Sequence, residues 1–173
     1  MTDRPHISAR EQILLTAKLL KIPAPYVRQV AARMKSDGRL PGRRPIAASV
    51  TPQSLARLVL GLCAPMPSKS TDLEMQLGAL PRSSGDGAET AELELENLIA
   101  EAVGIVDGDI DFWNSDVLIG VTQPVVGISV VKFDGTSTYR AYRTPAKKDD
   151  GMNHFVRLPL QTLRMLALEL MGD

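Results

Sequence analysis

The sequence predicts an α+β protein, with helices in its N-terminal part and a small antiparallel sheet with flanking helices in its C-terminal part. Apolar residues recur at helical spacing in the first 62 residues, whereas residues 117–143 contain three runs rich in β-branched side chains. The Asp134-Gly135 pair between two of these runs is a strong hairpin signal. Because residues between the two parts are rich in Pro, Ser and Gly, the predicted division is 1–65, a linker at 66–88, and 89–173.

Three helices are predicted within residues 1–65. The first begins at Ser8, which has the capping-box spacing with Glu11, and ends before Pro23. The second spans 24–37, and the third begins at Thr51, where a capping residue precedes a proline in the first turn. The apolar residues expected on the buried side of the second helix are Val27, Val30, Ala31 and Met34.

Residues 89–173 are predicted to form a helix, a sheet and a final helix. The first helix covers 89–103, and the final helix starts at Pro159. Since aromatic residues make up only 4% of the chain, we expect an aliphatic core of Leu, Val, Ile, Ala and Met. We also expect Trp113 to anchor the core of this C-terminal part. The strands are predicted at 117–123, 125–133 and 136–143, with 154–158 as a candidate fourth strand.

The composition indicates where the protein works. No apolar run approaches the ~20 residues that a membrane-spanning helix needs. The N-terminal residues lack the apolar segment of a secretory signal. The single cysteine, Cys63, cannot form an internal disulfide, which fits a reducing compartment. We therefore expect a cytoplasmic protein that has no contact with a membrane.

Charge is strongly segregated along the chain, although the net charge is zero. Residues 1–57 hold eleven Lys and Arg but three acidic residues, a net charge of +8. Residues 58–173 carry the compensating −8. A basic segment of this density attracts polyanions, because each contacted phosphate releases a condensed counterion.

Few residues suggest catalysis. The chain has two histidines, His6 and His154, and Cys63 is distant from both in sequence. His154 lies among apolar neighbours, which favours a packing role. Three alternating aspartates resemble the start of a calcium loop, but Phe112-Trp113 follows where that loop requires other residues. We predict that the protein is not an enzyme and that it has no catalytic residue, no metal site and no cofactor. The three aspartates are Asp107, Asp109 and Asp111.

Residues 17–34, AKLLKIPAPYVRQVAARM, resemble the helix-turn-helix of bacterial and phage DNA-binding proteins. Ala17 supplies the small residue of the first helix, Ile22 the hydrophobic residue at the turn, and Val27 the β-branched residue of the second helix. The pattern departs from the family where prolines crowd the turn. The resemblance implies a second helix that enters the major groove of double-stranded DNA. The groove contacts that it implies are Ala24, Tyr26, Arg28, Gln29, Arg33 and Lys35.

The segment that follows, GRLPGRRP at residues 38–45, resembles the wing or basic arm of winged-helix proteins. By this resemblance Arg39, Arg43 and Arg44 hold phosphates or enter a narrow minor groove. The N-terminal domain is thus expected to be a three-helix helix-turn-helix domain with a basic arm.

The first 65 residues also resemble phage and prophage proteins that join a helix-turn-helix to an Arg/Gly arm. This resemblance implies a transcriptional regulator or, alternatively, a small terminase subunit that marks viral DNA for packaging. We expect the acidic domain at 89–173 to form a dimer or a ring, or to bind a protein partner. A different hypothesis is that the protein is an adaptor that binds other proteins and not DNA. Its basic head would then dock an acidic partner or its own acidic tail.

Overall fold

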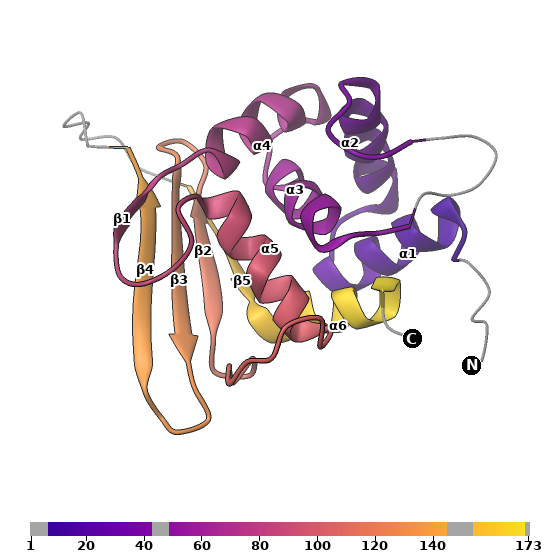
Figure 1. Cartoon of the computed structure of the whole chain (residues 1–173). Helices are drawn as coiled ribbons and strands as arrows, with labels where there is room; N and C mark the ends of the chain where they lie inside the picture. The colour runs from indigo at the N-terminus through magenta and orange to yellow at the C-terminus, as the bar shows by residue number, and fades with distance from the viewer. Residues whose placement is uncertain (1–6, 43–48, 145–153, 172–173) are drawn as a thin grey trace.

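The computed structural model describes residues 7–42, 49–144 and 154–171. In this part of the chain, helices cover one face of a five-stranded antiparallel sheet (Figure 1), which confirms the predicted α+β class. The elements in chain order are α1 (Ala9–Leu20), α2 (Ala24–Ser36), α3 (Pro52–Leu62), the 3-10 helix η1 (Pro67–Lys69), α4 (Ser70–Gly78), β1 (Arg82–Ser84), α5 (Ala91–Ala102), β2 (Asp116–Gly120), β3 (Val125–Val131), β4 (Ser137–Arg143), β5 (Phe155–Pro159) and α6 (Leu160–Met171).

The starts of the first and third helices follow from the predicted capping residues. The Ser8 backbone N–H donates to the Glu11 carboxylate at 2.8 Å, which completes the capping box of α1. Thr51 caps α3 in the same way, with Ser54 as its reciprocal partner. At the other end of α1, Lys21 has a φ of +56° and turns the chain toward α2.

Helix α3 joins two hydrophobic cores. Its Leu62 lies in a small core with α1, α2 and Leu40, whereas its Leu55 and Leu60 belong to the large core shared with α4, α5, α6 and the sheet. The approach of α2 to α3 is close at Gly61, where a Cβ would lie 2.4 Å from the Met34 sulfur. A glycine here lets the two helices pack, so that α2 is fixed against the rest of the protein.

The sheet has the strand order β1-β4-β3-β2-β5, and all pairs are antiparallel. Alternate residues of the strands point into the large core, as period-2 side-chain placement requires. The opposite face is not covered by any described helix (Figure 1) and exposes two aromatic side chains, Tyr139 and Phe155. The core-facing residues of the sheet include Val117, Ile119, Val126, Ile128 and Tyr142.

The segment at 66–88 contains η1, α4 and β1, and Leu73 and Leu77 of α4 lie in the large core. Whether 1–65 and 89–173 are separate folding units stays a prediction, but the segment between them is packed. None of the helices in the described ranges combines the length and apolar character that spanning a membrane requires.

Three details of the C-terminal prediction are wrong. Trp113 is 74% exposed, because aliphatic side chains together with Phe112 and Tyr142 fill the core. His154 is exposed as well, just before the edge strand β5. Strand β2 ends at Gly120 because the chain turns before Pro124, so residues 121–123 do not extend it.

A buried polar cluster joins α5 to the sheet. The Glu94 side chain is 3% exposed and accepts hydrogen bonds from the Tyr142 hydroxyl at 3.0 Å and from the Ala88 backbone N–H at 2.7 Å. It also forms an ion pair with Arg140. The carboxylate thereby fixes β4 and the loop that precedes α5, and the burial and the nearby charge raise the pKa of Tyr142.

We predict that Glu94→Ala lowers the free energy of unfolding by about 3–5 kcal/mol, because removing one partner leaves the other charge buried and unpaired. Urea denaturation followed by circular dichroism measures the change. The control is Glu96→Ala on the same helix, for which we expect a change within about 0.5 kcal/mol. Equal effects of the two substitutions would contradict a structural role for the cluster.

Candidate nucleic-acid interface

Helix α2 is amphipathic, and its buried side is the predicted one. Val27, Val30, Ala31 and Met34 are all at most 9% exposed. The opposite side of the helix faces solvent. Its central line consists of Gln29 and of residues without long side chains, namely Pro25, Ala32 and Ser36.

Cationic side chains lie on both flanks of this central line. Helical spacing places Arg28 and Lys35 on one flank and Arg33 on the other, and all three are exposed. The first turn of α2 contains no acidic residue. The exposed face of α2 is therefore a narrow ridge, formed by Gln29 and three residues with short side chains, between two basic edges.

Two of the predicted groove contacts on α2, Ala24 and Tyr26, contact the rest of the protein. Ala24 is half-buried against the small core. The Tyr26 hydroxyl donates to the Ala64 carbonyl, beyond the end of α3. Burial of this hydroxyl raises the pKa of Tyr26. Tyr26 thus ties α2 to α3.

Arg33 forms an ion pair with Asp37 at 2.8 Å. The two residues are one helical turn apart, and the Arg33 side chain is 51% exposed. Exposed pairs of this kind contribute roughly 0–1 kcal/mol. The guanidinium can exchange this carboxylate for a phosphate at little cost.

Arg39, predicted as a phosphate contact, is engaged inside the protein. Its guanidinium binds the Glu74 carboxylate through two hydrogen bonds, Nε to Oε2 at 2.7 Å and Nη2 to Oε1 at 2.8 Å. Glu74 is completely buried, and these bonds raise the pKa of Arg39. Glu92 of α5 lies 3.4 Å from the same guanidinium and binds Arg57 of α3 at 2.7 Å. This ion pair argues against Arg39 as a DNA contact, and Arg43 and Arg44 lie outside the described residues.

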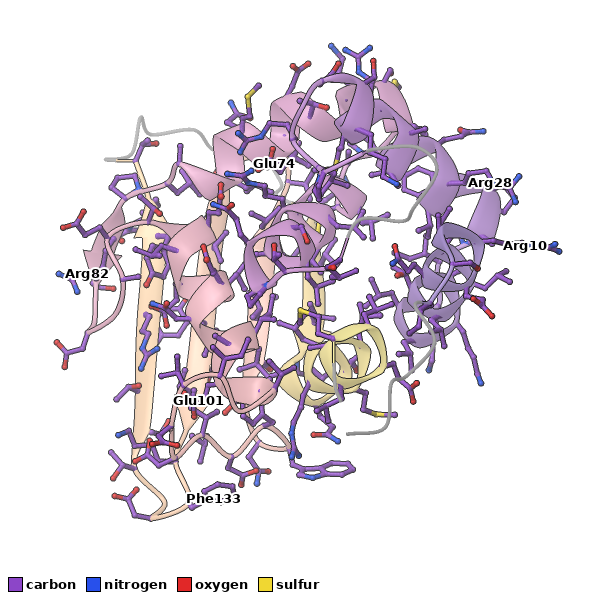
Figure 2. All side chains as sticks on the ribbon, turned by 45° about the vertical axis from the view of Figure 1, so that its right-hand side comes forward. Arg10, Arg28, Glu74, Arg82, Glu101 and Phe133 are labelled. Carbon is purple, nitrogen blue, oxygen red and sulfur yellow. The ribbon has the colours of Figure 1, made fainter. Side chains whose placement is uncertain are left out.

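Helix α1 adds a basic stripe that was not among the predicted contacts. Arg10, Leu14 and Lys18 follow one another at spacings of four residues, and Lys21 continues the line; we call these four residues the α1 stripe. All four are exposed, and the three cations form no ion pair with any residue that the structure describes. Figure 2 shows Arg10 and Arg28 at the same edge of the molecule, from α1 and α2 respectively. The i, i+4 spacing of these residues was the signal in the sequence.

Cys63 and His154, far apart in sequence, line the same pocket of about 520 Å³ beside the edge strand β5. The pocket does not make the thiol reactive, because burial raises the pKa of Cys63 to about 12. The Cys63 thiol instead donates to the Val59 carbonyl oxygen, with the sulfur 3.4 Å away.

We predict that Cys63 is alkylated by iodoacetamide at pH 8 far more slowly in the native protein than in urea, because only the thiolate reacts. Mass spectrometry of timed samples measures both rates. The raised pKa also means that the neutral thiol is favoured by folding. The contribution of Cys63 to the free energy of unfolding is therefore full below pH ~8.5, the ordinary thiol pKa. It is lost as the pH rises toward 12. Rapid native alkylation would show that the thiol is accessible and ionised.

We further predict that Arg39→Ala destabilises the protein by about 3–5 kcal/mol, since it leaves the Glu74 carboxylate buried without a partner. Arg28→Ala, which removes an exposed guanidinium, should change stability by no more than about 0.5 kcal/mol. Thermal and urea unfolding of the two variants provide the comparison. If Arg39→Ala leaves the free energy of unfolding unchanged, the ion pair with Glu74 is not structural, and Arg39 is available to a partner at the surface.

No group of three or more His, Cys, Asp or Glu side chains within 7–42, 49–144 and 154–171 is placed to hold a metal ion. The geometry singles out the exposed ridge of α2 with the neighbouring stripe of α1.

Comparison of the chain with protein-family models, with curated proteins and with solved structures finds no match.

Proposed function

We propose that this protein binds double-stranded DNA through the exposed face of α2 and regulates transcription. The observation that carries the proposal is the composition of this face, a ridge of small residues flanked by Arg28 and Lys35 on one side and Arg33 on the other. An α-helix enters the major groove with its outer side chains toward the bases, while flanking cations meet the phosphates on the groove walls. The ridge has the form that such an approach requires.

Two side chains of the exposed face have the chemistry for reading bases, namely Gln29 on the ridge and Arg28 on the flank near the start of α2. Arg28 offers a planar fork of donors that suits guanine, and the Gln29 amide suits adenine. Both are exposed, and no acidic residue of α2 lies within one helical turn of either. These two residues are our candidates for sequence discrimination.

The remaining cations supply affinity rather than discrimination. Lys35 and Arg33 flank the ridge. Phosphate contacts of this type position a protein on the duplex without reading its sequence. The rigid packing of α2 against α3 supports this use, because a recognition helix needs a fixed orientation.

The test is binding to a pool of random-sequence duplexes, followed by selection and a salt series. We expect the wild type to bind with a steep dependence on salt. Arg28→Ala/Arg33→Ala should lower the slope of log K against log salt by about one for each phosphate that the variant no longer neutralises. The double variant should also show no preference for the selected sequence. Fluorescence anisotropy measures both quantities.

The matched control is Lys69→Ala/Arg143→Ala, which removes the same number of positive charges from exposed positions outside α1 and α2. It should leave both the slope and the preference nearly unchanged. If the wild type binds no duplex at low salt, the proposed function is wrong. Equal effects of the two double variants would mean that net charge, and not the α2 face, produces binding.

A further inference from the structure

The loops at the end of the sheet where β2 starts expose four large apolar side chains. We call Ile105, Val106, Trp113 and Phe133 the end patch; their exposed fractions are 64%, 53%, 74% and 77%. Soluble proteins seldom expose several large apolar residues together unless they form an interaction site, and Trp is among the residues that contribute most at interfaces.

The loops that carry the end patch are held together by their backbones. The Asp111 N–H donates to the Val131 carbonyl at 2.8 Å, and the Phe133 N–H donates to the Asp109 carbonyl at 3.0 Å. The Glu101 carboxylate accepts from the Ile110 N–H at 2.9 Å and thereby ties this loop to α5. The patch is built on an ordered scaffold, so a partner need not order it.

The surroundings of the end patch are acidic. The same loops contain four aspartates and one lysine, Lys132, which pairs with Asp109 at 3.0 Å. Arg164 of α6 lies over the Phe112 ring. A partner must therefore combine an apolar side chain with positive charges. The four aspartates are Asp107, Asp109, Asp111 and Asp134.

The α1 stripe has this composition. Leu14 is 48% exposed, with Arg10 one turn before it and Lys18 one turn after it. Its charge and apolar centre complement those of the end patch. The two surfaces lie apart within one molecule, since Figure 2 shows Arg10 at the right-hand edge and Phe133 at the lower end.

We propose that the protein associates head to tail, with the α1 stripe of one copy seated on the end patch of the next. Two different surfaces meet in such a contact, so it propagates into a chain or closes into a ring. The three cations of the α1 stripe and the aspartates around the end patch favour this contact at low salt. The proposal does not depend on DNA binding.

Light scattering with size exclusion, over a range of protein concentrations and salt, tests the proposal with two variants. Leu14→Glu/Lys18→Glu alters the α1 stripe, and Trp113→Ala/Phe133→Ser alters the end patch. We expect the wild type to exceed the dimer mass with rising concentration at low salt, and each variant alone to be a monomer. An equimolar mixture of the variants should form a 1:1 complex only, because one intact stripe and one intact patch remain.

Circular dichroism of each variant verifies that it is folded, and Tyr139→Ala serves as the matched control because it removes an exposed aromatic from the open sheet face. This control should associate like the wild type. A wild type that stays monomeric, a mixture that fails to combine, or a dimer that never grows would overturn the proposal. Failure of Tyr139→Ala to associate would assign the contact to the sheet face instead.

Discussion

The ion pair between Arg39 and the buried Glu74 determines how the basic part of the chain is arranged. Arg39 follows the end of α2, and Glu74 lies on α4, so the pair connects the helix with the exposed basic ridge to the layer that covers the sheet. A guanidinium held by two hydrogen bonds has little freedom to turn outward. The same pair therefore fixes the end of α2 and withdraws one arginine from the surface.

Apart from Arg33, which pairs with Asp37 at the surface, the cations that the structure describes within residues 1–57 fall into two groups. Arg39 and Arg57 neutralise Glu74 and Glu92 within the fold, whereas Arg28, Lys35 and the α1 stripe stay free of described acidic partners. Formal charge along the sequence overstates the charge that a partner meets, because part of it is used inside. Among the described residues, the unpaired positive charge of this segment lies on α1 and α2, and both proposals rest on it.

Local patterns in the sequence were sufficient to predict α1, α2, α3, α5, α6 and the strands from β2 to β5. The segment 66–88, predicted as a linker, contains η1, α4 and β1. The buried stripe of α2 follows from its 3.6-residue period, and the start of α1 follows from Ser8 and Glu11. The partner of Arg39 lies 35 residues away, and no local signal links the two. The low aromatic content correctly predicts an aliphatic core, but the sequence does not show which aromatic residues enter it: Phe112 and Tyr142 do, and Trp113 does not. Ion pairs between residues far apart in the sequence depend on how the fold packs. Only the three-dimensional structure therefore distinguishes the free arginines from the paired ones.

The most direct test of DNA binding through α2 is to titrate ¹⁵N-labelled protein with a duplex and follow the backbone amide shifts. Our account predicts that the largest changes occur at residues 24–36, while amides of β2 and β3 stay in place. Changes concentrated on the open sheet face around Tyr139 and Phe155, or on the end patch, would contradict it. No change at saturating duplex would contradict it as well.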